Sequence, residues 1–186
     1  DKPAPLPVQC GKGARHDTLE NAWFSYLGQP EGFVYRPVNR LDKGTSGLMV
    51  IAKSAHAQDL LQRQLHTDRF RREYLAVTEG IPQPPAGSIE LPIAKEDAAS
   101  VRRIVTPAGK ACKTHYRVLL TAGSRSLVRL QLETGRTHQI RVHLSAIGCP
   151  VCGDFLYGKE LDCLPGRFAL HSAYLTLVHP FTGEEL

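Results

Sequence analysis

The chain has 186 residues, of which 22% are charged and 42% are hydrophobic, and its formal net charge is +5. This length and composition fit a globular domain with a buried core, and no apolar run reaches the roughly 18 residues that a membrane-spanning helix needs. The five cysteines are an odd number in a chain that is not small, so we do not expect a disulfide framework, and a reducing compartment fits. The N-terminal residues lack the features of a signal peptide. We therefore expect a cytoplasmic protein with no membrane association.

The sequence predicts interspersed helices and strands. The first helix has a capping-box pair, Asp17 and Glu20, and Gly28 ends it. A later helix has Ile140 and Leu144 on one face. In chain order, we expect a helix over 17–27, a strand over 48–52, a helix after Ser54, strands over 73–78, 101–105, 112–119 and 126–133, the helix that Gly148 ends, and a strand over 168–178. The alternation is not regular, so the pattern favours an α+β fold, a mixed sheet with helices packed on it.

The charge is distributed unevenly along the chain. The stretch from Ala98 to Leu132 contains no acidic residue and carries Arg102, Arg103, Lys110, Lys113, Arg117, Arg125 and Arg129. A basic field of this kind favours a polyanionic partner such as a nucleic acid. A solvated basic face without a partner is the alternative.

Asp42 lies in a turn-rich segment that leads into the predicted strand 48–52. Its neighbours include the cations Arg36, Arg40 and Lys43, which would keep a carboxylate ionised at neutral pH. This pattern predicts an active-site carboxylate. A structural aspartate that caps a turn or neutralises an arginine is the alternative.

A second motif runs from Thr134 to His143 and predicts a strand end, a tight turn and a helix start. Arg136 and several backbone N–H groups would then lie at a helix N-terminus, where anions are favoured. His138 and His143 do not have the spacing of two metal ligands. A step of five residues turns the second side chain about 140° away on a helix, and to the opposite face on a strand.

Tyr74 follows a basic cluster on a predicted strand, where a tyrosine can stack on a nucleobase and offer an oxygen for proton transfer. A half-buried packing tyrosine is the alternative. Cys149 and Cys152 form a single C-x-x-C pair, without the second pair that a zinc ribbon needs, and we interpret them as free structural cysteines.

Taken together, these motifs resemble the RluA-type family of pseudouridine synthases. The matching segments are Asn39-Arg-Leu-Asp-Lys-Gly-Thr-Ser-Gly-Leu48, Tyr74-Leu-Ala-Val-Thr-Glu-Gly80, Gly135 to His143, and Gly153-Asp-Phe-Leu-Tyr-Gly158. The resemblance runs nearly from end to end. Asn39 replaces the usual histidine, at an orienting position rather than the reactive one.

The resemblance implies the pseudouridine synthase fold, a largely antiparallel mixed sheet flanked by helices with a central active-site cleft. We expect residues 1–186 to form a single catalytic domain of a chain that is cut at both ends. We expect no separate RNA-binding module ahead of it. The partner would be structured RNA, ribosomal or transfer RNA, bound by a monomer.

The resemblance also implies an isomerase that breaks the N-glycosidic bond of a uridine and rejoins the uracil through carbon 5, with no cofactor and no metal. Asp42 matches the catalytic aspartate, Tyr74 the tyrosine that stacks on the uracil, and Arg136 the basic partner of the aspartate. Arg40 matches the residue that fills the gap left by the flipped nucleotide. The other expected substrate-binding residues are Arg36, Thr45, His138, Gln139, Ile140 and Arg141. The sequence leaves open whether Asp42 attacks the sugar carbon or removes the 2′ proton.

Two other functions are alternatives. A non-catalytic RNA-binding protein would not need the combination of Asp42, Tyr74 and Arg136, because binding alone requires no reactive acid. A metal-dependent nuclease would need clustered carboxylates, which the sequence does not contain.

Overall fold

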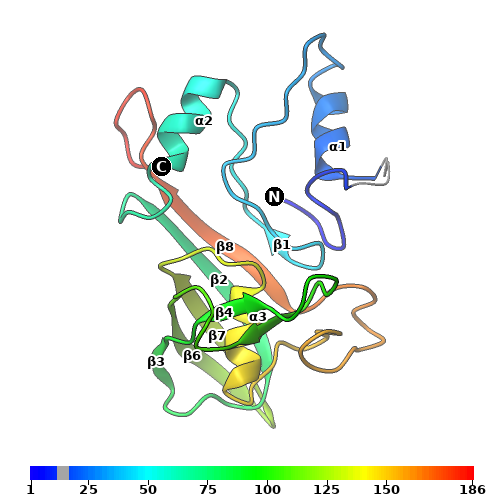
Figure 1. Cartoon of the computed structure of the whole chain (residues 1–186), viewed down its shortest axis with the longest axis vertical. Coiled ribbons are helices and arrows are strands. Elements are labelled where there is room, and N and C mark those ends of the chain that lie inside the picture. The colour runs from blue at the N-terminus through cyan, green and yellow to red at the C-terminus, as the bar shows by residue number, and fades with distance from the viewer. Residues whose placement is uncertain (12–16) are drawn as a thin grey trace.

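The computed structural model describes residues 1–11 and 17–186. The elements in this part of the chain are α1 (Leu19–Tyr26), β1 (Ser46–Gly47), α2 (Ala55–Gln62), β2 (Phe70–Glu79), β3 (Ala86–Ile89), β4 (Ile93–Lys95), β5 (Arg103–Val105), β6 (Thr114–Ala122), β7 (Arg125–Leu132), α3 (Gln139–Ala146) and β8 (Leu170–Leu177). The long strands β2 and β8 run from the part that holds α3 to the part that holds α1 and α2 (Figure 1). Across the described residues, no helix combines the length and apolarity needed to cross a membrane.

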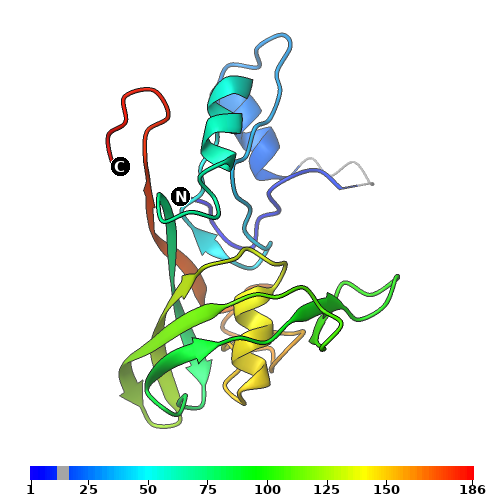
Figure 2. The same cartoon turned by 60° about the vertical axis from the view of Figure 1, so that its left-hand side comes forward.

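One sheet of six strands, in the order β1-β8-β2-β7-β6-β3, organises the fold. Its β1–β8 pair is parallel, and its other pairs are antiparallel. Strands β4 and β5 form a separate antiparallel hairpin, which lies in front of α3 in Figure 1 and extends beyond it on the right in Figure 2. The prediction of a mixed, largely antiparallel sheet with helices packed on it is confirmed.

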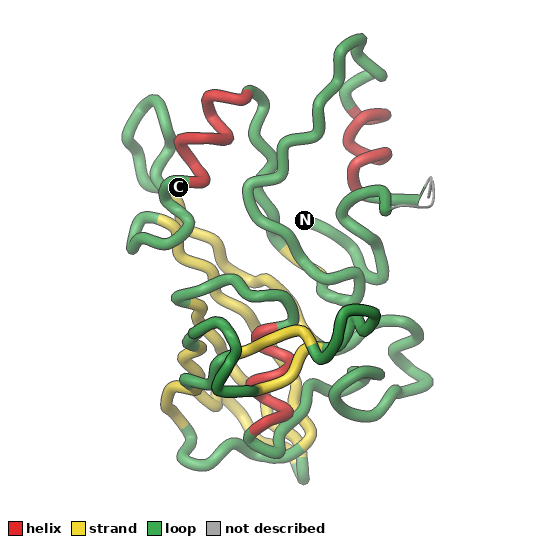
Figure 3. The backbone as a smooth tube through the Cα atoms, viewed as in Figure 1, coloured by secondary structure: helices red, strands yellow, loops and turns green. Residues whose placement is uncertain are grey.

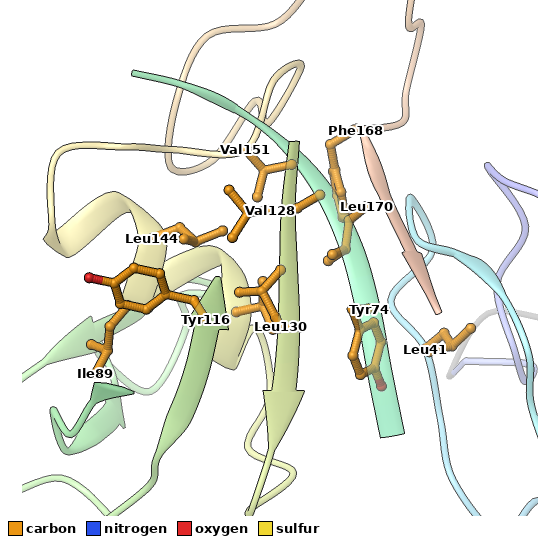
Figure 4. Packing of buried hydrophobic residues seen from close by; sticks show 12 residues of the cluster. Leu41, Tyr74, Ile89, Tyr116, Val128, Leu130, Leu144, Val151, Phe168 and Leu170 are labelled. Atoms are coloured by element: carbon orange, nitrogen blue, oxygen red, sulfur yellow. The ribbon is translucent and has the colours of Figure 1, made fainter. Parts of the chain in front are cut away.

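Alternation along β2 and β7 places the main core between the sheet and α3. Every second side chain of β2 is buried, and Val128 and Leu130 of β7 have no exposed surface. Ile140 and Leu144 of α3 pack against them, because a helix buries residues three and four apart on one face. Figure 4 shows this cluster, with Tyr74 of β2 at its edge beside Leu41.

The predicted first helix is confirmed as α1, but its predicted cap is wrong. The N-cap is Thr18 rather than Asp17, and the Thr18 hydroxyl accepts a hydrogen bond from the Asn21 N–H at 3.3 Å. Gly28 ends the helix as expected, in a left-handed conformation with φ of +79°.

The strand predicted over 48–52 is wrong, since the regular strand covers only Ser46–Gly47. Residues 48–52 nevertheless pair with a loop. The Val38 N–H donates to the Val50 carbonyl at 2.8 Å, and the Ala52 N–H donates to the Arg36 carbonyl at 2.9 Å. Figure 3 shows how much of the chain between α1 and α2 is loop. These bonds brace the segment that leads to Asp42.

The buried Lys2 side chain stabilises the turn after Asp42 by a hydrogen bond to its backbone. Its side chain lies in the interior, with 1% of the residue exposed, and its Nζ donates to the carbonyls of Pro3, Leu6 and Lys43 at 3.0, 2.8 and 3.3 Å. Burial lowers the pKa of Lys2 to about 8. The backbones of Lys2 and Gly47 also exchange hydrogen bonds of 2.8 and 3.0 Å.

Gly47 allows β1 to approach β8 closely, and we expect Gly47→Ala to destabilise the fold. A Cβ at this position would lie 2.3 Å from the Ser172 carbonyl oxygen, and φ is +115°. Strain and overpacking together should lower the free energy of unfolding by roughly 2–4 kcal/mol in urea titrations. Gly123→Ala is the control, because φ is +58° there but no atom lies within 4 Å of a Cβ. Equal losses in the two variants would contradict this prediction.

Candidate active site

A cleft of about 880 Å³ lies between the loop around Asp42 and the start of α3. Loop residues 37–43 and the end of α2 form one side, and β2 with the turn before α3 forms the other. All sequence-predicted site residues except Arg36 line this cleft, namely Arg40, Asp42, Thr45, Tyr74, Arg136, His138, Gln139, Ile140 and Arg141.

Asp42 forms an ion pair with Arg141 of α3. The Arg141 Nη1 donates to Asp42 Oδ2 at 3.0 Å. The other edge of the guanidinium donates to Asp154, from Nε to Oδ2 at 2.6 Å and from Nη2 to Oδ1 at 2.9 Å. Asp154 has no exposed surface, whereas the Asp42 side chain is 26% exposed toward the cleft. Asp42 is therefore the carboxylate of this set that a substrate can reach.

Aromatic rings surround the Arg141 guanidinium. Its central carbon lies 4.2 Å from the ring centroid of Phe168 and 5.0 Å from that of Tyr157. Burial favours the neutral form of Arg141, but the hydrogen bonds and charge of Asp154, together with Asp42, outweigh it and raise the pKa of Arg141. The side chain therefore stays charged and is held in one orientation.

The expected ion pair between Arg136 and Asp42 is wrong. Arg136 is exposed, and its Nε and Nη2 both lie 3.4 Å from the carbonyl oxygen of Ala111, away from Asp42. Helix α3 begins only at Gln139, so Arg136 lies in the turn before it. Arg141, inside the helix, occupies the position beside the carboxylate.

The turn before α3 is fixed by Gln139. Its Oε1 accepts hydrogen bonds from the Thr134 hydroxyl at 2.9 Å and the Arg136 N–H at 3.0 Å, and its Nε2 donates to the Lys113 carbonyl and Thr114 hydroxyl at 3.0 Å. The side-chain amide that was expected to bind substrate is thus engaged within the protein.

His138 is the N-cap residue of α3 and has a left-handed backbone, with φ of +60°. Its Nδ1 is hydrogen-bonded to the Tyr157 hydroxyl at 2.8 Å, and its Nε2 lies 3.8 Å from Asp42 Oδ2. Burial lowers the pKa of His138, although the charge of Asp42 opposes the shift. A neutral imidazole therefore lies beside the carboxylate at neutral pH.

Tyr74 lies on the wall of the cleft that β2 forms. Only 6% of the residue is exposed, and β2 holds it between Leu130 of β7 and Ser172 of β8. Burial raises the pKa of the Tyr74 hydroxyl, while the positive charge of Arg72 opposes the shift. Tyr74 therefore belongs both to the core and to the cleft lining, and its hydroxyl is protonated at neutral pH.

The other predicted residues differ in accessibility. Arg40 is exposed at the cleft, whereas Thr45 is buried, and its N–H donates to the Asp42 carbonyl at 3.1 Å. Ile140 belongs to the main core and also forms part of the cleft lining. Arg36 contributes its backbone to the loop but does not line the cleft.

Part of the basic stretch is neutralised by acids from neighbouring strands. Lys113 pairs with Glu90 and Glu133, and Arg125 and Arg129 pair with Glu79 and Glu73 of β2. Within the described chain, no carboxylate lies in ion-pair distance of Arg102, Arg103, Lys110 and Arg117. Arg103 is beside the site, since its N–H donates to the Tyr157 hydroxyl at 2.8 Å.

His143 and the cysteines of the C-x-x-C pair are buried inside the protein. His143 is fully buried, and its ring nitrogens are hydrogen-bonded to the Thr114 hydroxyl and the Leu91 carbonyl, both at 2.9 Å. Cys149 and Cys152 are buried free thiols. In residues 1–11 and 17–186, no group of three or more His, Cys, Asp or Glu side chains is arranged to hold a metal ion.

Sequence reasoning missed Asp154 and Tyr157 as site residues. Both belong to the Gly153–Gly158 segment that carried the family resemblance, and that resemblance was the signal that could have found them. Asp154 orients Arg141, and Tyr157 orients His138. Residue spacing within the segment could not predict either role, because the partners Arg141 and His138 lie on α3 and at its N-cap.

We expect Arg141→Ala to be far more destabilising than Arg136→Ala. Removing Arg141 leaves the buried Asp154 carboxylate without its partner, which should cost about 3–5 kcal/mol of unfolding free energy in urea titrations. Arg136→Ala removes only long contacts of an exposed side chain and should leave stability nearly unchanged. A large loss in Arg136→Ala with a small one in Arg141→Ala would restore the original assignment.

Comparison with known proteins gives concordant matches. The family model described as RNA pseudouridylate synthase matches residues 1–146. An uncharacterized RNA pseudouridine synthase of Chloroflexus aurantiacus is 44% identical over 99% of this chain and 59% of its own length. Ribosomal large subunit pseudouridine synthase D of Nitrosomonas europaea is 42% identical over 100% of this chain and 56% of its own length.

A solved structure agrees in fold. Human RNA Pseudouridylate Synthase Domain Containing 1 superposes with a TM-score of 0.76 at 28% identity, covering 97% of this chain and 81% of that chain. This chain spans less than two thirds of the length of the bacterial relatives above. On the strength of the family match and of identities above 40%, the chain belongs to the RNA pseudouridylate synthase family.

Proposed function

We propose that this chain isomerises uridine to pseudouridine in RNA, with Asp42 as the catalytic carboxylate. The observation that carries the proposal is the arrangement of Asp42 in the cleft. Its carboxylate is partly exposed, is oriented by the Arg141 guanidinium, and shares the cleft with Tyr74. A family relationship alone would not assign a reactive group to this chain, but an accessible, oriented carboxylate beside an aromatic wall is suited to act on a nucleoside.

The reaction needs little beyond these groups. The bond between ribose carbon 1′ and uracil nitrogen 1 breaks, the uracil turns, and carbon 5 bonds to carbon 1′, while the proton on carbon 5 is lost and nitrogen 1 gains one. No net oxidation occurs. Asp42 either bonds to carbon 1′ or accepts the 2′ proton, and the hydrogen bond from Arg141 orients it in both cases.

The uridine must leave the RNA stack to reach Asp42. Flipping costs a few kcal/mol, which contacts in the pocket offset. Tyr74 provides a ring against which the uracil can stack, and the exposed Arg40 is placed to contact the RNA at the cleft. Arg103, the first residue of β5, and Arg102 directly before it add positive charge near Tyr157.

Ribosomal RNA of the large subunit is the substrate class we propose, and transfer RNA is the alternative. The support is that relatives 42% and 40% identical to this chain carry the name ribosomal large subunit pseudouridine synthase D. The buried thiols of Cys112, Cys149 and Cys152 fit a reducing cytoplasm, where ribosomes are made.

The test is Asp42→Asn, assayed by tritium release from RNA transcripts that contain uridine labelled at carbon 5. The substitution keeps the shape of the side chain but removes its nucleophilic and basic character. We expect the rate to fall on the order of 10³-fold or more. RNA affinity should be retained, because the variant loses a negative charge that repels phosphates.

Asp59→Asn is the matched control, since Asp59 is an exposed acid on α2 that pairs with Arg63. It should behave like the wild type, and wild-type activity should persist in the presence of a chelator. Tritium release by Asp42→Asn at the wild-type rate would refute the catalytic role of Asp42.

A further inference from the structure

Arg72 is a buried cation in the cleft, and it has no role in the proposed reaction as described above. It lies on β2 two residues before Tyr74, so both side chains project from the same face of the strand. Only 6% of the residue is exposed, and it lines the same cleft as Asp42.

The contacts of Arg72 include the ring of Phe70, whose centroid lies 6.0 Å from the guanidinium carbon, but no negatively charged group. Its Nη2 donates to the Leu65 carbonyl over a long 3.4 Å, and its Nε, although buried, has no hydrogen-bond partner. Its Nη1 lies against the turn before α3, where a Cβ on Gly135 would be only 2.8 Å away. In the described part of the chain, no carboxylate comes within 4.0 Å of this guanidinium, whereas Arg141 contacts two.

An unpaired buried guanidinium is costly, because it has given up water without gaining a counter-ion. Burial accordingly lowers the pKa of Arg72. A structural role would be met by a bound carboxylate or by several carbonyl groups, as Lys2 is by three. A ligand with negative charge that enters the cleft would supply the missing partner.

We propose that Arg72 stabilises the uracil at the moment it leaves the ribose. This inference rests on the proposed function. When the glycosidic bond breaks, its electron pair stays with the base, so the departing uracil carries one negative charge spread over nitrogen 1 and its two carbonyl oxygens. Asp42 loses its charge in the same step, by bonding to carbon 1′ or by taking the 2′ proton. Negative charge thus moves from the Arg141 side of the cleft into the base.

The position of Arg72 fits a base better than a phosphate. Arg72, Asp42 and Tyr74 all line the same cleft, so a uracil that stacks on Tyr74 shares the cleft with both charged side chains. Because Arg72 is buried, a phosphate could pair with it only by entering the cleft with its full charge. The flipped base must enter in any case, and the exposed Arg40 and Arg136 are available to phosphates at the cleft opening.

The experiment compares Arg72→Met and Arg72→Lys in the full chain, with Arg71→Met as the matched control. Arg71 is the adjacent residue on β2, but it is exposed and pairs with Glu185. Methionine fills a similar space without charge, and replacing an uncompensated buried charge by an apolar side chain should preserve the fold. Single-turnover pseudouridine formation at saturating enzyme and the dissociation constant for the RNA are measured for each variant.

We expect Arg72→Met to lower the saturating rate by about 10²–10³-fold, the loss typical for a group that stabilises developing negative charge, with the RNA dissociation constant unchanged. Arg72→Lys should restore part of the rate, and Arg71→Met should match the wild type. RNA with 5-fluorouridine at the target site provides a second readout, followed as its disappearance from nuclease digests. Fluorine stabilises the uracil anion, so the loss caused by Arg72→Met should be smaller with this RNA.

The other outcomes overturn the proposal. A weaker dissociation constant with an unchanged saturating rate would identify a phosphate contact, and equal losses with both RNAs would indicate a purely structural role. An active wild type with an equally active Arg72→Met would remove Arg72 from the reaction while leaving the proposed function intact. A wild type that is inactive on uridine in every RNA tested would instead refute the proposed function, and the role of Arg72 with it.

Discussion

The Arg141 guanidinium, shared between Asp42 and Asp154, is the contact on which the geometry of the site depends. It joins helix α3 both to the segment that follows it and to the loop before β1, in which Asp42 lies 99 residues earlier in the sequence. Asp154 is fully buried and uses both oxygens on Arg141, so it fixes the direction of the guanidinium. The remaining donor then sets the position of Asp42. The buried Asp154 thus orients the accessible Asp42 through the Arg141 guanidinium, which contacts both carboxylates.

The sheet provides the rigid frame for this contact. Strand β2 lies between β7 and β8, and its inward side chains belong to both the core and the cleft wall. Tyr74 is held by two neighbouring strands and Arg141 by a helix packed on the same sheet, whereas Asp42 is carried by a loop. The loop is positioned from outside, by backbone bonds to residues 48–52 and by the Lys2 ammonium. Catalytic groups on a loop therefore keep a defined position because a scaffold surrounds them.

Local patterns in the sequence predicted most of the elements, since strand alternation and helical spacing are properties of neighbouring residues. The motifs also identified the cleft, whose lining includes all the expected residues but Arg36. The choice of Arg136 over Arg141 was taken from the resemblance, and it failed because the motif contains both arginines and only the fold shows that Arg141 reaches Asp42. His138 adopts a left-handed conformation that delays the helix start, and a hydrogen bond to Tyr157, nineteen residues away, accompanies it. The pairing of Arg125 and Arg129 with acids of β2 was equally hidden, because only the sheet register brings them together.

Lys2 has a practical consequence for anyone who shortens or tags the chain. Residues 1–6 look dispensable in the sequence, since they carry no motif of the cleft. Their ammonium group nevertheless reaches the backbone directly after Asp42, and the chain start also hydrogen-bonds to Gly47. Trimming this segment, or acetylating Lys2, would remove the hydrogen bond that supports the turn after Asp42 while leaving the side chains of the proposed reaction in place. A truncated version that folds but is inactive would therefore be a poor guide to the chemistry of the intact chain.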